Sequence, residues 1–117
     1  MSMVIYMAHP VAGDVPANLA RALRWLRWLT ATNPDATYIA PWIAAIISGE
    51  DDDDPAARAR GLAHDVVTVK RCDGLVLVGG RVSSGMAIER DAMLAHGGRV
   101  IDLTYIGDEP PSLQVAP

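Results

Sequence analysis

Cysteine is nearly absent from this chain, and its scarcity limits both the chemistry and the environment of the protein. Cys72 is the single cysteine among 117 residues, so no disulfide can form within the chain. A reducing compartment fits that composition. The N-terminal segment 1–6 also lacks the basic residues and the long apolar core of a secretory leader, so we expect a cytoplasmic protein.

Long apolar runs and an excess of positive charge are missing as well. No segment approaches the roughly 18 consecutive apolar residues that cross a membrane, so we expect no membrane partner. The net charge is −4 and the pI is about 5.1, which argues against a nucleic-acid polymer as partner. Arg21, Arg24 and Arg27 follow helical spacing and are interpreted as one solvated face.

The densest acidic cluster, Glu50–Asp54, predicts a solvated loop instead of a metal site. Consecutive carboxylates point in different directions, and the spaced ligands and turn glycine of a calcium-binding loop are missing. We therefore expect no metal and no cofactor.

Short apolar runs alternate with helical periodicities along the chain. We expect strands at 4–8, 37–40, 74–78 and 100–103, and helices at 14–30, 42–48, 55–71 and 85–96. This order predicts an α/β fold with an open parallel sheet of about four to five strands and helices on both faces, a flavodoxin-like or Rossmann-like three-layer arrangement. We expect one domain over residues 1–107 and a proline-rich tail over 108–117.

Two loops mark the expected binding site. Ligands of open parallel sheets bind beyond the carboxyl ends of the strands, which places the loops 8–14 and 79–85 at the mouth. The second loop leads into a helix, whose unpaired N–H groups and macrodipole favour an anion. Glu89 lies about one turn into that helix, where its carboxylate can face the mouth. The alternative interpretation is a glycine-rich turn followed by a helix that an early acid stabilises.

Four short motifs occur at defined positions: I-Y-M-A-x-P at 5–10, C-D-G at 72–74, S-x-G-x-x-x-E at 83–89, and G-G followed by R-V-I-D-L at 97–103. Together they resemble the nucleoside 2-deoxyribosyltransferase-like family over about residues 4–104. The A-P-W, R-C-D-G and G-G-R-V-S-S-G-M segments are similar to a bacterial and phage-associated branch of that family.

The resemblance implies roles for three residues. Glu89 falls on the nucleophile of the family, whose carboxylate stabilises or bonds to the anomeric carbon as an N-glycosidic bond breaks. Tyr6 matches the hydroxyl that orients the nucleophile, and Asp65 matches an acid that assists the departing base. The expected function is therefore an N-glycosidic-bond enzyme, a hydrolase or deoxyribosyltransferase, that acts on a nucleoside or a nucleoside 5′-monophosphate. Tyr6 as an ordinary core aromatic and Asp65 as an exposed helix carboxylate are the alternatives.

Further residues are candidate substrate contacts near the expected mouth. By resemblance, a serine at position 83 favours a monophosphate over an unphosphorylated nucleoside. The alternatives are that Ser83 is a helix cap, that His9 caps its loop, that Arg81 is a solvated loop charge, and that Asp73 caps or hydrogen-bonds the backbone. The candidate substrate-binding residues are Ser83, Ser84, Gly85, His9, Arg81, Asp73 and Trp42.

Two other classes of function remain open from the sequence. A nucleotide-binding or sensing module without turnover would use the same loop, with Glu89 bonded to a ribose hydroxyl. A structural oligomer would use the apolar segment 42–47 as an interface. In either case we expect a homodimer or homotetramer, because a domain this small gains stability from association.

Overall fold

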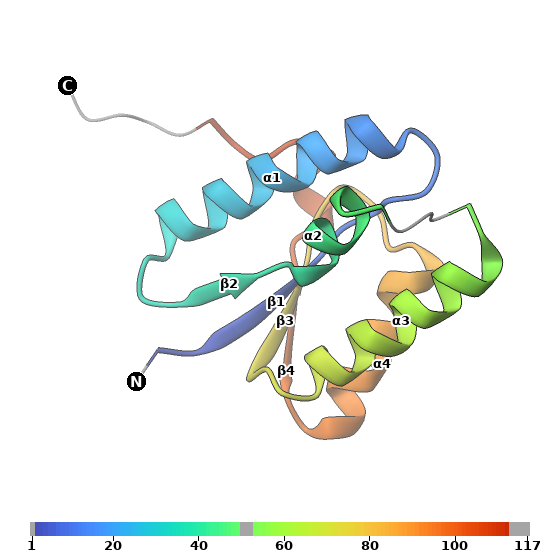
Figure 1. Ribbon diagram of the computed structural model, residues 1–117. Coiled ribbons are helices and arrows are strands. Elements are labelled where there is room, and N and C mark those ends of the chain that lie inside the picture. The colour runs from blue at the N-terminus through green and yellow to red at the C-terminus, as the bar shows by residue number, and fades with distance from the viewer. Residues whose placement is uncertain (1, 50–52, 113–117) are drawn as a thin grey trace.

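The protein is a four-stranded parallel sheet between two layers of helices. The computed structural model describes residues 2–49 and 53–112. The strands are β1 (Val4–Ala8), β2 (Thr37–Ile39), β3 (Gly74–Leu77) and β4 (Arg99–Asp102), in the order β2-β1-β3-β4 (Figure 1). The predicted open parallel sheet is confirmed, and each observed strand lies within one residue of its expected bounds.

The two inner strands form the centre of the core. β1 pairs with β2 on one side and with β3 on the other, with Tyr6 opposite both Ile39 and Leu75. All four residues of β3 are buried, which explains why the strand is apolar without alternation: both of its faces are covered by helices.

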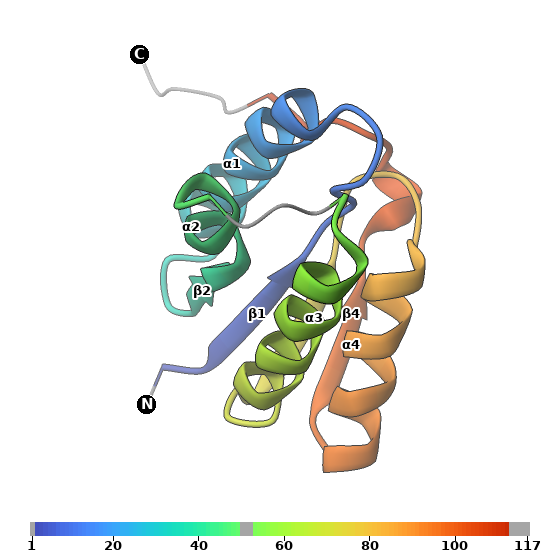
Figure 2. The same ribbon diagram turned by 45° about the vertical axis from the view of Figure 1, so that its right-hand side comes forward.

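The helices lie on both faces of the sheet, as predicted. α1 (Val15–Thr32) covers one face, and α3 (Pro55–Val69) and α4 (Ser84–His96) lie side by side on the other (Figures 1 and 2). The short α2 (Pro41–Ile47) follows β2 and contacts α3. A 3₁₀ helix, η1 (Thr104–Ile106), follows β4 and was not predicted.

Side-chain caps fix the starts of the three long helices. Asp14 accepts from the N–H of Ala17 at 3.2 Å, and Asp54 accepts from the N–H of Ala56 at 3.1 Å. The hydroxyl of Ser83 accepts from the N–H of Met86 at 3.3 Å, so Ser83 is a helix cap. A polar side chain at this position satisfies one of the N–H groups that the first helical turn leaves unpaired.

A C-terminal strap, residues 107–112, lies against α1. The indole N–H of Trp25 donates to the carbonyl of Asp108 at 2.8 Å, and the guanidinium of Arg24 pairs with Glu109 at 2.6 and 2.8 Å. A side-chain oxygen of Asp108 lies directly where Gly80 would carry a Cβ. The strap therefore joins α1 to the loop that follows β3. Residues 113–117 of the expected tail lie outside the described part of the chain.

Residues 50–52 of the acidic cluster lie outside the described residues. Within 2–49 and 53–112, no helix is long and apolar enough to cross a membrane.

The loops that follow β1 and β3 touch each other at Gly79. This glycine has a φ of +102°, and a Cβ built on it would lie 2.7 Å from both His9 and Pro10. A side chain at this position would therefore force the two loops apart. Gly79 makes the close approach of the two strand ends possible.

We expect Gly79→Ala to lower the free energy of unfolding by about 2–4 kcal/mol, through backbone strain and the clash with His9 and Pro10. Gly13→Ala is the matched control, because Gly13 has a φ of +105° but open space around it. The control should lose only the strain component, about 1 kcal/mol. Chemical denaturation of both variants measures the difference. Equal losses would show that the loops do not pack as described.

Candidate active site

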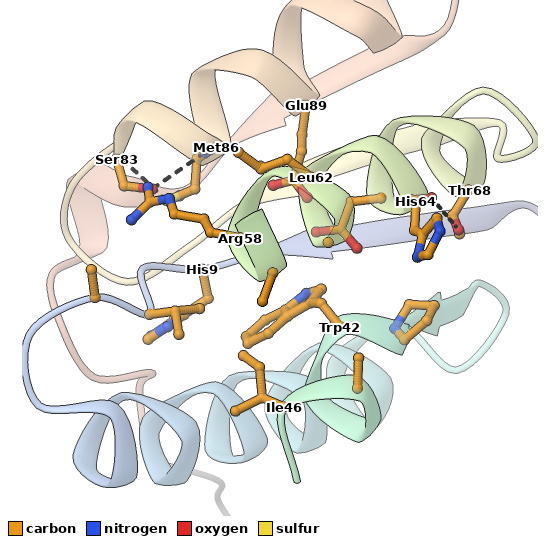
Figure 3. Close-up of a pocket in the computed structure, with 18 residues that line it drawn as sticks. His9, Trp42, Ile46, Arg58, Leu62, His64, Thr68, Ser83, Met86 and Glu89 are labelled. Carbon is orange, nitrogen blue, oxygen red and sulfur yellow. Dashed lines mark hydrogen bonds between the residues drawn. The ribbon is translucent and has the colours of Figure 1, made fainter. Parts of the chain in front are cut away.

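A pocket of about 200 Å³ opens beyond the carboxyl end of β1. Its walls come from the loop after β1, from α2, from one face of α3 and from the first turns of α4 (Figure 3). β1 and β3 are neighbours whose following helices lie on opposite faces of the sheet, so the pocket lies at the switch point of this topology. It is lined by six of the ten residues predicted from the sequence or by resemblance: His9, Trp42, Asp65, Ser83, Gly85 and Glu89.

The carboxyl of Glu89 is a buried polar group of the pocket. It is only 6% exposed, although it belongs to a residue type that is seldom buried without a partner. The hydroxyl of Tyr6 donates to Glu89 Oε2 at 2.6 Å. Tyr6 is the central residue of β1 and is fully buried, so this hydrogen bond joins the middle of the sheet to α4.

Asp65 on α3 is the second carboxyl of the cluster. It forms a side-chain hydrogen bond with Glu89, so the site contains two carboxyls in contact. Two carboxyls form such a bond only when a proton lies between them. We call Tyr6, Asp65 and Glu89 the carboxyl cluster.

The cluster changes the acidity of its members. Burial, followed by the charge of Asp65 and the hydrogen bond with it, raises the pKa of Glu89 to about 8, against the opposing effect of the Tyr6 hydroxyl. Burial and the charge of Glu89 raise the pKa of Tyr6, which keeps the phenol protonated and able to donate. Glu89 therefore exchanges a proton near neutral pH, as a general acid or base requires.

Trp42 forms an apolar wall of the pocket. The indole N–H donates to the carbonyl of Met7 at 2.8 Å, which ties α2 to the end of β1. Because this N–H is already bonded, the ring can offer a ligand only its apolar surface. Ile46, one turn later on α2, extends the same wall on the side away from α4 (Figure 3).

His9 lines the pocket with one ring nitrogen unpaired. Its Nδ1 lies 2.6 Å from the carbonyl of Pro10 and donates to it, because a carbonyl oxygen only accepts. Its Nε2 is buried and has no partner among the described residues. Burial lowers the pKa of His9, so the ring is neutral and Nε2 carries a lone pair.

The rim of the pocket contains an arginine that the sequence analysis missed. Arg58 on α3 extends toward Ser83 and donates from Nη2 to the hydroxyl of Ser84 at 3.3 Å (Figure 3). The side chain of Ser84 is exposed and is not part of the lining. The signal that was available is spacing: Arg58 precedes Asp65 by seven residues, two helical turns, and therefore shares its face of α3.

Besides Ser84, two predicted substrate contacts lie outside the pocket. Asp73 accepts a hydrogen bond from the N–H of Val4 at 2.8 Å, at the amino end of the sheet and opposite the pocket. Its predicted role in substrate binding is therefore corrected to a link between the starts of β1 and β3. Arg81 is exposed and does not line the pocket.

No group of three or more metal-binding side chains occurs among residues 2–49 and 53–112.

The raised pKa of Glu89 predicts that the free energy of unfolding depends on pH. A carboxyl whose folded-state pKa lies above its unfolded value stabilises the fold at low pH, and that contribution is lost as the pH rises through the folded pKa. We expect the free energy of unfolding to fall by about 1–2 kcal/mol more in the wild type than in Glu89→Gln between pH 7 and pH 9.

Denaturation curves at a series of pH values measure this difference. Asp91→Asn is the control, because Asp91 lies on the same helix but is exposed. The Asn variant should follow the wild type. Parallel pH profiles for all three proteins would contradict a raised pKa at Glu89.

Comparison with known proteins identifies the family of this chain. A comparison with curated proteins finds no match to this chain. A family described as a domain of unknown function, DUF7768, matches residues 3–102. The matched range begins before β1, ends with β4 and contains the whole carboxyl cluster. The chain therefore belongs to the DUF7768 family.

Proposed function

We propose that the protein is an N-glycosidic-bond enzyme that acts on a nucleoside or a nucleoside 5′-monophosphate, as hydrolase or deoxyribosyltransferase. The observation that carries the proposal is the carboxyl cluster: a buried Glu89, oriented by Tyr6 and bonded to a second carboxyl in a pocket. The resemblance of the sequence motifs to the nucleoside 2-deoxyribosyltransferase-like family supports the same chemistry.

The proposed first step forms a bond between Glu89 and the anomeric carbon of the sugar. The bond from that carbon to the base nitrogen breaks, and its electron pair leaves with the base. Positive charge grows on the sugar during this step, and a carboxylate beside it stabilises the transition state. The Tyr6 hydroxyl fixes the orientation of Glu89 and favours its ionised form.

The proton of the carboxyl cluster supplies the acid for the departing base. As the sugar becomes cationic, the ionised form of Glu89 is favoured, and the shared proton moves to Asp65. Asp65 then protonates the base nitrogen, which makes the base a better leaving group. In the second step water, or another base, attacks the anomeric carbon and releases Glu89, with Asp65 accepting the proton of the attacking group.

The apolar wall suits the base in this arrangement. Trp42 offers a flat ring surface without a free N–H, and a nucleobase can pack against it. The volume of about 200 Å³ is enclosed by α2 on the apolar side and by α3 and α4 on the polar side.

We expect Glu89→Gln to lower base release by roughly 10³-fold or more, because the amide cannot form the glycosyl intermediate. Asp65→Asn should lose about 10²–10⁴-fold with ordinary nucleobases and much less with a leaving group that needs no proton. Chromatography of reactions with a panel of nucleosides and monophosphates measures the free base.

Asp91→Asn, on the exposed side of α4, is the matched control and should retain full activity. Absence of base release by the wild type across the whole panel would reject the enzyme. Tight nucleotide binding that is insensitive to Glu89→Gln would then favour a binding module without turnover.

Tyr6→Phe should shift the pH dependence of the reaction. The hydroxyl of Tyr6 lowers the pKa of Glu89, so its removal should raise that pKa and move the alkaline limb of the kcat profile, where the cluster loses the proton that Asp65 delivers, to higher pH. We expect about a tenfold loss of kcat near neutral pH, because Glu89 loses the donor that orients it, and a smaller loss at higher pH, where the variant keeps the cluster proton longer. A uniform loss across all pH values would show that Tyr6 supports the fold without tuning Glu89.

A further inference from the structure

The lining of the pocket is divided by charge along its length. Arg58 is the one arginine or lysine side chain among the described lining residues, and it lies at the rim. The carboxyls of Asp65 and Glu89 lie deeper, beside the middle of β1. A ligand that spans the pocket therefore meets a cationic end and an acidic end.

Helical spacing fixes the separation of these two ends. Arg58 and Asp65 are seven residues apart on α3, and Ser83 and Glu89 are six residues apart on α4. At 1.5 Å per residue, the pairs span about 10.5 and 9 Å along their helices. Both helices lead into strands of one parallel sheet and run in the same direction, so Arg58 and Ser83 lie at one end of the pocket and Asp65 and Glu89 lie at the other.

The guanidinium of Arg58 retains most of its hydrogen-bonding capacity. It makes no salt bridge with any described residue, and its one side-chain hydrogen bond, to Ser84, uses one of five N–H donors. The Ser84 hydroxyl accepts this bond, so its own proton remains available for a ligand. The unused N–H groups of Arg58 therefore lie beside the start of α4, where a helix N-terminus also favours an anion.

His9 lines the same pocket and contains an unpaired buried nitrogen. It is only 5% exposed, and its Nε2 is the buried side-chain polar atom without a partner among the described residues. A buried polar group left unpaired is unfavourable for folding, and such groups occur where a ligand completes the hydrogen bonding. Nε2 lies beside Gly79, 2.8 Å from where a Cβ of that residue would be, so the unpaired nitrogen is at the junction of the two loops that border the pocket.

We propose that Arg58 is the specificity-determining residue of this pocket and selects a ligand with a phosphate on the sugar, a nucleoside 5′-monophosphate over the corresponding nucleoside. The inference rests on the proposed function for the identity of the ligand. It adds that Arg58 distinguishes a phosphorylated ligand from an unphosphorylated one. The guanidinium binds the phosphate at the rim, while the sugar reaches the carboxyl cluster below.

The test is a binding measurement that needs no turnover. Calorimetry on the Glu89→Gln background uses 2′-deoxynucleoside 5′-monophosphates and the matching deoxynucleosides, one pair for each common base. We expect the phosphate to tighten binding about 10- to 100-fold, and Arg58→Ala to abolish this preference while changing nucleoside affinity less than about twofold. Arg60→Ala is the matched control, because Arg60 is exposed on the same helix and does not line the pocket.

The outcomes separate this inference from the proposed function. Equal affinity for phosphorylated and unphosphorylated ligands, or equal losses in the Arg58 and Arg60 variants, would overturn the role of Arg58 even if the wild type releases bases. A phosphate preference that depends on Arg58, in a protein that releases no base, would support the inference and reject the enzyme. Binding of neither ligand class would overturn both. Circular dichroism of each variant confirms that the fold is intact.

Discussion

The hydrogen bond between Tyr6 and Glu89 is the contact on which the arrangement of the pocket depends. It crosses from the centre of the sheet to α4, and both partners are buried. A carboxyl placed at this depth is unfavourable unless a donor or a proton compensates for lost hydration, and Tyr6 and Asp65 provide both. The position of α4 against the sheet, the raised pKa of Glu89 and the closeness of α3 are linked through this single contact.

Much of the fold was predictable because local signals and tertiary structure agree. The unbroken apolar run at β3 is explained by helices on both of its faces, and the caps at Asp14 and Asp54 fix where helices begin. The 3₁₀ helix η1 carries no such signal. Asp102 accepts hydrogen bonds from the N–H and the hydroxyl of Thr104 at 2.9 and 2.6 Å, next to the start of η1. Short polar segments make such local contacts in many conformations, so this pair does not predict a 3₁₀ helix.

The site was less predictable because it depends on how deeply each side chain is buried and on where that side chain points. Sequence alone cannot show that Asp65 reaches Glu89, since that contact is set by how closely α3 packs on α4. Gly85 contributes to this closeness, because a Cβ there would lie 3.3 Å from Leu62. Asp73 is a different case: a residue that precedes a parallel strand lies at the amino end of the sheet, so its distance from the pocket followed from the predicted topology.

The C-terminal strap has a consequence for comparing members of the family. The region common to the family ends at residue 102, but the strap that presses Asp108 against Gly80 and pairs Glu109 with α1 begins five residues later. Gly80 is adjacent to the glycine that His9 packs against, so one wall of the pocket is supported by sequence beyond the shared domain. Differences between members in the residues that follow the domain would therefore act on the loop that His9 packs against.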